Sequence, residues 1–333
     1  MNIPQLFAEF RNLHVGVIGD VMLDTYMWGH VERISPEAPV PVVSVTGKEY
    51  RIGGAGNVAL NLASLGAKAS ILSVTGKDED GRQLRSMFEE KGIDTQFICP
   101  SSDRITTNKT RVISRNQQMM RLDAEVTHDL NSEEENQLLA SVVRFLDEVA
   151  PAIVIFEDYN KGVLTERVIR EVLELCRQRN IPTAVDPKRR HFFQYRGVDI
   201  FKPNLKEVKE GLNLIDEGVS PELMDRIHAQ LQERLGHRIS FITLSEHGAY
   251  YHNGVEHRLI PSHRRNIADV SGAGDTVIAV AALVYAVTRN VDLMAEMANI
   301  AGGLVCEEVG TVAINSERLF QECMLLLDKQ ASV

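Results

Sequence analysis

Short apolar segments rich in β-branched residues alternate with amphipathic segments of helical length along most of the chain. The expected strands are residues 14–19, 69–74, 152–156, 183–185, 199–201 and 240–244, and the expected helices between them are residues 56–65, 81–91 and 165–179. Further helices are expected over residues 276–288, 293–306 and 316–327. Such alternation is typical of βαβ units. The pattern therefore predicts an α/β fold with a central, mostly parallel β-sheet flanked by helices.

Two segments interrupt this alternation, residues 24–50 and 96–125. Both are rich in β-branched and aromatic residues and lack an amphipathic helix period, which favours strands. We expect them to form a small β-sheet that projects near the carboxyl ends of the main strands, where ligands bind in open α/β folds. This sheet would act as a lid, or its exposed face would pack against a second subunit. Residues 1–333 would then form a single domain with two lid insertions.

The most informative motif is Asp-Val-Ser-Gly-Ala-Gly-Asp-Thr at residues 269–276, which leads directly into an apolar helical segment. Two glycines would allow the amides of Gly272, Ala273 and Gly274 to converge at the helix start, where unpaired N–H groups and the helix dipole favour an anion. Asp275 is then placed to act as a general base on a hydroxyl during phosphoryl transfer. The alternative is a tight turn in which Asp275 only caps the helix.

Acids and glycines also follow the first expected strands. Asp20 and Asp24 could accept paired hydrogen bonds from the vicinal hydroxyls of a sugar. Gly53 and Gly54 would allow a substrate to approach the backbone closely, and Asn57 would supply both a donor and an acceptor. Each of these residues also suits an ordinary turn. The spacing of the glycines does not match a dinucleotide-binding fingerprint.

Similar residues follow the later strands. Glu207 could hold Mg²⁺ through water while Asn204 reaches a nucleotide phosphate, although for this pair alone a helix cap is the simpler interpretation. Residues 243–248 offer hydroxyls and a glycine for a ribose or phosphate, and they equally fit a β-turn. Residues 157–162 and 186–188 each place a carboxylate and an ammonium group at the same expected edge.

Composition narrows the function. The chain has 333 residues, 44% of them hydrophobic, so it can bury a large core. A net charge of −10 argues against a nucleic-acid partner. Basic clusters at residues 109–121 and 188–190 could bind an anionic substrate or form solvated faces. The four cysteines are widely separated, and neither a signal peptide nor a bilayer-length apolar stretch is present, which predicts a cytoplasmic protein with reduced thiols and no membrane partner.

Gly53-Gly54 and residues 269–275 resemble the two signatures of the ribokinase (PfkB) family of carbohydrate kinases, and residues 204–207 resemble its Asn-x-x-Glu element. The resemblance covers nearly the whole chain. Within the family, the chain resembles the D-glycero-β-D-manno-heptose-7-phosphate 1-kinase branch. The segments that carry this closer resemblance are residues 19–24, 33–42, 114–118 and 121–123, of which Arg-Ile-Ser-Pro-Glu-Ala-Pro-Val-Pro-Val at residues 33–42 is the most specific.

The resemblance implies a ribokinase-like fold and transfer of the γ-phosphate of Mg·ATP to the anomeric hydroxyl of heptose 7-phosphate, a step toward ADP-heptose and the lipopolysaccharide core. Asp275 would be the base, and the amides of Gly272 to Gly274 the anion hole. Asp20, Asp24, Gly54 and Asn57 would hold the sugar, and Gly53, Asp158 and Lys161 are expected beside it. The resemblance does not say which cations bind the 7-phosphate, and our candidates are Lys109, Arg111, Lys188 and Arg189. Residues expected on the ATP side are Asn204, Glu207, Thr243, Ser245, Glu246 and Gly248, with Glu207 holding Mg²⁺ through water. The lid would form a homodimer, and a monovalent cation near the anion hole is left open.

Two features depart from the family pattern. Ser271 stands where many relatives have Thr, which keeps the hydroxyl. The chain ends at Val333 after a helix, so we expect a single-domain form without the fused adenylyltransferase domain, and a separate adenylyltransferase. Two alternatives remain: another PfkB-type kinase of sugars, sugar phosphates or nucleosides, with Trp28 as the only tryptophan for a base pocket, and a non-catalytic sugar-binding protein. The presence of Asp275 and Glu207 counts against the second.

Overall fold

The computed structural model describes residues 2–115, 117–215, 218–263 and 265–327. Asn116, part of the motif at residues 114–118, therefore lies outside the described residues. Within them, the main sheet has nine strands in the order β13-β12-β11-β10-β9-β8-β1-β4-β5. Their bounds are β1 (His14–Gly19), β4 (Lys68–Gly76), β5 (Ile98–Ser101), β8 (Ile153–Glu157), β9 (Thr183–Asp186), β10 (Ile200–Phe201), β11 (Ile239–Thr243), β12 (Ala249–His252) and β13 (His257–Ile260).

The strands from β11 to β5 run parallel, and within the described residues the antiparallel pairs of this sheet are β11–β12 and β12–β13 at one end. The central strand β1 is apolar on both faces, with Val15, Val17 and Ile18 fully buried, as a parallel strand covered on both sides requires. Position 16 in the same strand requires glycine, because a Cβ there would come within 2.4 Å of the Phe145 ring. The expected α/β fold with a mostly parallel sheet is confirmed.

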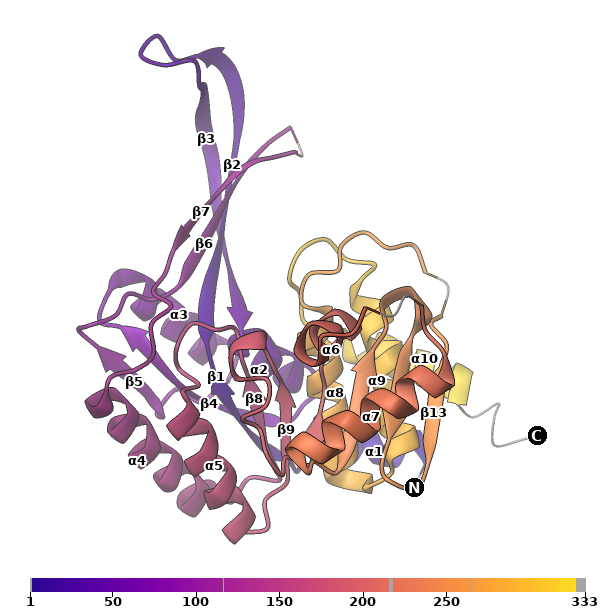
Figure 1. The fold of residues 1–333 in the computed structure, drawn as a ribbon. Helices are drawn as coiled ribbons and strands as arrows, with labels where there is room; N and C mark the ends of the chain where they lie inside the picture. The colour runs from indigo at the N-terminus through magenta and orange to yellow at the C-terminus, as the bar shows by residue number, and fades with distance from the viewer. Residues whose placement is uncertain (1, 116, 216–217, 264, 328–333) are drawn as a thin grey trace.

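Helices cover both faces of the main sheet and enclose two apolar cores (Figure 1). One face carries α1 (Ile3–Phe10), α2 (Ala55–Ser64), α3 (Glu79–Glu90), α8 (Ala273–Thr288), α9 (Val291–Val305) and α10 (Ser316–Leu327). The other face carries α4 (Ser132–Val149), α5 (Glu166–Gln178), α6 (Leu205–Leu212) and α7 (Pro221–Leu235). Short 3₁₀ turns occur at η1 (Arg189–His191) and η2 (Ser245–His247). None of the described helices combines the length and the apolarity that crossing a bilayer requires.

A second sheet of four strands within the described residues, in the order β3-β2-β6-β7, projects away from the main sheet as a long ribbon (Figure 1). Its strands are β2 (Val21–Ile34), β3 (Pro41–Gly54), β6 (Asn108–Ser114) and β7 (Gln117–Ala124). The expected small sheet is therefore present, but its bounds differ from the predicted insertions. The first insertion starts at Val21, and β5, which lies inside the predicted 96–125 range, pairs with β4 in the main sheet.

Candidate active site

Buried carboxylates gather at the carboxyl ends of the central strands. Glu157 ends β8, Asp186 ends β9, and Asp275 lies in the first turn of α8. One carboxylate oxygen from each of these three residues lies within 4.8 Å of the other two. Adjacent parallel strands end at the same edge of the sheet, which explains why residues far apart in sequence converge here. The cluster is the chemical centre of the candidate site.

The Asp275 carboxylate is buried and held by two side-chain donors. The Nδ2 of Asn57 donates to its Oδ2 over 2.7 Å, and the Tyr159 hydroxyl donates to its Oδ1 over 2.8 Å. Burial raises the pKa of Asp275, and the two hydrogen bonds oppose that increase. Asp275 is therefore a carboxylate with elevated basicity and a restricted orientation, which suits a general base.

The start of α8 requires glycine. Gly272, the N-cap residue, has a left-handed φ of 77°, and a Cβ there would come within 2.7 Å of Asn57 Nδ2. Among the described residues, the N–H groups of Gly272 and Gly274 have no backbone or side-chain acceptor, whereas the N–H of Ala273 donates to Val270 O over 3.3 Å. These free amides and the helix dipole provide the electrostatics of an anion site beside the Asp275 carboxylate.

The other two acids of the cluster have opposite electrostatic character. Burial, followed by the nearby Asp186 and Asp275, raises the pKa of Glu157 well above its usual range. Neither oxygen of Glu157 has a hydrogen-bond partner among the described residues. Burial would also raise the pKa of Asp186, but the ammonium groups of Lys188 and Lys202 outweigh it and lower this pKa. Lys202, itself buried, lies 2.8 Å from Asp186.

Asp20 organises the loop that carries Tyr159. Its carboxylate accepts the backbone N–H groups of Tyr159, Lys161 and Val163 at 2.9–3.1 Å. Burial, followed by the neighbouring Asp158, raises the pKa of Asp20 to about 6. Asp158 in turn accepts the Tyr195 hydroxyl over 2.8 Å. Both acids are thus engaged within the protein, and they position the loop beside Asp275.

Cations gather where the lid joins the main sheet. Arg111 on β6 pairs with Asp24 on β2 at 2.5 Å. Next to them, Lys161 and Lys109 share one carboxylate, since their Nζ atoms lie 2.7 Å and 3.9 Å from Glu125. All three members of this group are less than a quarter exposed. Burial, followed by the charge of Lys161, lowers the pKa of Lys109. These two ammonium groups and one carboxylate together carry a net positive charge.

Two glycines allow close packing at the base of the lid. A Cβ at Gly53 would come within 2.4 Å of Asp24 Oδ2, and one at Gly54, whose φ is +61°, would come within 2.3 Å of Asp20 O. Asn57 lies in the first turn of α2, shortly after these glycines. It is fully buried, and its Oδ1 has no hydrogen-bond partner among the described residues. The two glycines therefore allow β3 to pass close to both acids, and the Asn57 oxygen remains available as an acceptor.

The residues expected on the ATP side lie on the next strands along the sheet. Asn204 and Glu207 form a reciprocal helix cap at the start of α6, and Glu207 also accepts Lys188 Nζ over 2.6 Å. Thr243 ends β11 and forms an isolated bridge with Asn204. Ser245 and Glu246 lie in η2, followed by a Gly248 whose φ is +88°. Arg189 is exposed at η1.

Four residues of the site were not singled out from the sequence: Glu157, Tyr159, Asp186 and Lys202. The segments 157–162 and 186–188 were recognised as strand ends, yet within them only Asp158, Lys161 and Lys188 were proposed. An acid directly at the end of a buried strand was the available signal for Glu157 and Asp186. Lys202 and Tyr159 gave no local signal, because their roles depend on partners far away in sequence.

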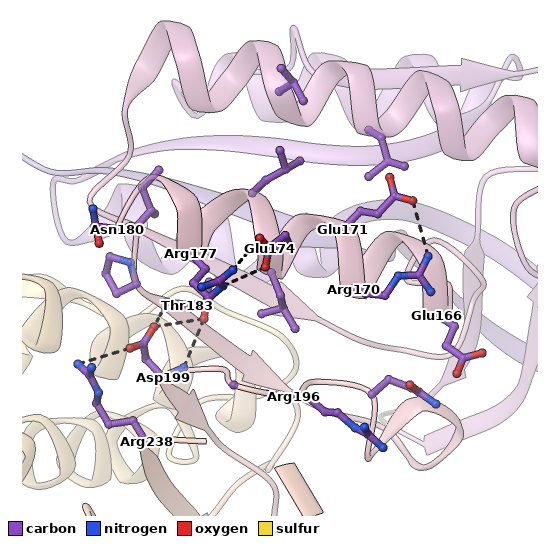
Figure 2. A pocket seen from close by; sticks show the side chains of 18 of the residues that line it. Glu166, Arg170, Glu171, Glu174, Arg177, Asn180, Thr183, Arg196, Asp199 and Arg238 are labelled. Atoms are coloured by element: carbon purple, nitrogen blue, oxygen red, sulfur yellow. Dashed lines mark hydrogen bonds and ion pairs between the residues drawn. The ribbon is translucent and has the colours of Figure 1, made fainter. Parts of the chain in front are cut away.

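A cavity of about 1310 Å³ lies away from this cluster (Figure 2). It borders Thr183, which begins β9, and Asp199, which directly precedes β10, so it lies at the amino-terminal edge of the sheet. Figure 2 shows Asp199 between Thr183 and Arg238, and Arg177 paired with Glu174. The cavity therefore belongs to the opposite end of the strands from the acids.

Comparison with known proteins adds independent evidence. Residues 12–318 match the pfkB family carbohydrate kinases. The protein called bifunctional protein HldE of Syntrophotalea carbinolica is 38% identical over 324 residues, 96% of this chain and 65% of its own length. The protein of the same name from Geobacter sulfurreducens is 40% identical over 317 residues, 94% of this chain and 64% of its own length. The chain thus spans slightly less than two thirds of these relatives.

Solved structures share the fold. Phosphofructokinase-2 from Escherichia coli in complex with potassium superposes with a TM-score of 0.78 at 18% identity, covering 95% of this chain and 99% of that one. Arabidopsis thaliana ribokinase complexed with ribose and ATP superposes with a TM-score of 0.71 at 15% identity, covering 93% and 99%. At these identities the similarity concerns the fold alone, and it confirms the ribokinase-like architecture.

Proposed function

We propose a specific substrate for this chain, which belongs to the pfkB family of carbohydrate kinases and is thus an ATP-using phosphotransferase with a sugar hydroxyl as acceptor. The proposed substrate is D-glycero-β-D-manno-heptose 7-phosphate. The γ-phosphoryl group of ATP would pass to the anomeric hydroxyl, giving the 1,7-bisphosphate for ADP-heptose and the lipopolysaccharide core. The observation that carries the catalytic part is the buried Asp275 carboxylate, held by Asn57 and Tyr159 beside free amides. The choice of heptose rests on the sequence at residues 33–42 and on the relatives at 38% and 40% identity.

In the proposed mechanism Asp275 removes the proton of the anomeric hydroxyl as that oxygen attacks phosphorus. Its pKa, raised by burial, makes it a stronger base than an exposed aspartate. Asn57 and Tyr159 orient the carboxylate, so that the proton acceptor is in place before the reaction. The N–H groups of Gly272 and Gly274, which have no acceptor among the described residues, stabilise the negative charge on the transferring group, whereas the N–H of Ala273, expected in the same role, donates to Val270 O. The proton leaves on Asp275 and returns to solvent after product release.

The acid cluster fits a magnesium ion. Glu157 presents two buried oxygens without partners among the described residues, and Mg²⁺ takes oxygen ligands with several retained waters. Glu157 and Asp186 would hold the ion directly, and Glu207 would hold it through water. When bound, Mg²⁺ neutralises charge on the phosphate oxygens. Lys202 and Lys188 balance the charge of the acids around it.

The 7-phosphate would bind at the base of the lid, between Lys161 and Lys109. The two ammonium groups share the Glu125 carboxylate, so one positive charge of this group is left to attract the phosphate. Arg111, held by Asp24, borders the same region. Gly53, Gly54 and Asn57 would line the sugar between this phosphate and Asp275. On the far side of Asp186, Asn204, Thr243, Ser245, Glu246 and Gly248 would contact the nucleotide.

The lid would also form the dimer contact of a cytoplasmic enzyme. Strand β7 is exposed along its whole length, and it includes Met119, Met120 and Leu122, which are 41–54% exposed. An exposed apolar strand at a sheet edge is commonly covered by another chain. Sedimentation of the protein would test this, because a monomer at micromolar concentration contradicts the proposed dimer.

The decisive experiment measures ADP release with heptose 7-phosphate, fructose 6-phosphate and ribose under identical conditions. We expect kcat/KM to be highest with heptose 7-phosphate, and ³¹P spectroscopy to place the new phosphate on the anomeric carbon. Equal or better turnover of fructose 6-phosphate or ribose would overturn the heptose assignment while leaving the kinase activity in place. Absence of turnover with all sugars would instead favour a non-catalytic binding protein.

A further inference from the structure

Three residues with metal-binding side chains meet at the edge of the main sheet, several strands away from the acid cluster. Asp225 lies on α7, His252 ends β12 and His257 begins β13. One ligand atom of each lies within 4.8 Å of the other two, a spacing shared among the described residues only by Glu157, Asp186 and Asp275. His252 and His257 are directly paired across the β12–β13 hairpin, so their side chains lie on the same face of it.

The backbone and hydrogen bonds around the group hold it in place. The hairpin turns through Gly254, whose φ is +90° and whose N–H donates to His252 Nδ1 over 2.9 Å, a bond that metal ligation by His252 would have to replace. Asn253 accepts two further N–H groups within the turn, at 3.0 Å and 2.7 Å. On the helix side, the Tyr250 hydroxyl donates to Asp225 Oδ1 over 2.6 Å. Such outer contacts orient the ligands of a metal site.

A further histidine holds the His252 ring in place. The ring of His228, on α7, stacks on the ring of His252 at 3.6 Å between centroids and 9° between planes. This stack fixes the plane of the His252 ring and adds a contact between α7 and the β12–β13 hairpin.

We propose that Asp225, His252 and His257 bind one divalent transition metal ion of the zinc class and so tie α7 to the β12–β13 hairpin. Two imidazoles and one carboxylate favour Zn²⁺, Ni²⁺, Co²⁺ or Cu²⁺ over Mg²⁺ and Ca²⁺, which take oxygen ligands. Three protein ligands leave a fourth position for water. His257 Nδ1 donates to Asp225 Oδ1 over 2.5 Å; metal binding through this nitrogen replaces the bond, and the proton moves to Nε2 of the same ring. Two ligands around tetrahedral zinc lie roughly 3.3 Å apart, so the pair also separates slightly.

The test uses the full chain, stripped of metal and held in excess Mg²⁺ so that the oxygen-rich acid cluster does not compete. Zn²⁺ is titrated against a chelating dye, and Co²⁺ is added separately because its visible absorption reports nitrogen and oxygen ligation. We expect one zinc ion per chain, and a loss of affinity on the order of 100-fold or more in His257→Ala. The matched control is His30→Ala, which removes a half-buried histidine whose Nε2 lies 3.2 Å from Glu32 on the lid and should leave zinc affinity unchanged.

Unchanged zinc affinity in His257→Ala overturns the proposal, as does displacement of the zinc by Mg²⁺ or the absence of a bound ion in the unaltered protein. Should His257→Ala fail to fold, Asp225→Asn provides the second test, because it removes the anionic ligand with little change in volume. Its expected result is the same loss of zinc affinity and loss of the Co²⁺ absorption. Neither readout involves kinase activity, so the outcome is independent of the proposed function.

Discussion

Replacing Tyr159 by Phe removes one of the two donors to the proposed base. The Tyr159 hydroxyl lies 2.8 Å from Asp275 Oδ1 in a buried setting, and it lowers the pKa of that carboxyl against the effect of burial. A hydrogen bond to a charged group contributes about 1.5–3 kcal/mol. Its loss should therefore raise the pKa of Asp275 further above the usual range of an aspartate.

The sign of the effect on activity follows from the role of the base. Asp275 must be ionised to accept the proton, so a higher pKa moves the acid limb of the kcat/KM profile to higher pH. We expect Tyr159→Phe to lose activity mainly on the acid side and to recover part of it as the pH rises. The measurement is kcat/KM for the sugar between about pH 5 and pH 9, at saturating Mg·ATP.

A matched control separates this effect from general damage. Tyr195→Phe also removes a buried hydroxyl that donates to an aspartate, Asp158, over 2.8 Å, but it does not touch Asp275. It should lower stability and leave the acid limb in place. An acid limb that stays put or moves to lower pH in Tyr159→Phe, or that shifts equally in both variants, would refute the assignment of Asp275 as the base.

Three further predictions follow from the same geometry. Asp275→Asn should lower kcat by about 10² to 10⁴ while sugar affinity, measured by calorimetry, is largely kept; full ATP turnover in this variant would exclude the mechanism. Lys161→Gln should raise KM for the sugar phosphate by about 10- to 100-fold, because a charge-assisted bond is lost. The control is Lys206→Gln, which removes an exposed lysine on α6 and should leave this KM unchanged. An equal rise in KM for ATP in Lys161→Gln would argue against a phosphate contact at Lys161. Asp20→Asn should lower the free energy of unfolding in urea by about 2–4 kcal/mol, because an amide nitrogen would face backbone N–H groups, and unchanged stability would show that the loop does not depend on this carboxylate.

Much of the fold followed from local patterns. The apolar runs at residues 14–19 and 152–156 coincide with β1 and, within a residue, with β8, and the motif at residues 269–276 does open a buried helix. Three helices were not predicted: α1, α4 and α7. For α4 the sequence does carry a signal, since Asn131 and Glu134 have the spacing of a reciprocal helix cap and form one at its start.

The site was predicted less completely, for a physical reason. Asp275 could be named because glycines, the acid and the helix occur together in the sequence. Its donors could not be paired with it, because Asn57 lies 218 positions away and Tyr159 lies 116 positions away, and only the packing of α2 and α8 against the sheet brings them together. Asp20 shows the converse. Its place after β1 suggested a sugar ligand, yet its oxygens are engaged by backbone amides, so the sugar contact stays a prediction.

The loop anchored by Asp20 carries Tyr159, which touches the base, and Lys161, which reaches the cations at the lid. Within the proposed kinase, one end of this loop contacts the base and the other contacts the cations. The loop therefore sets the distance between the reacting hydroxyl and the phosphate of the bound sugar phosphate. A sugar phosphate one carbon shorter could reach either the Asp275 base or the cations around Lys161, but not both at once. Loosening the anchor with Asp20→Asn should therefore narrow the gap in kcat/KM between seven-carbon and six-carbon phosphates, and a preference that persists undiminished would locate the measuring element elsewhere.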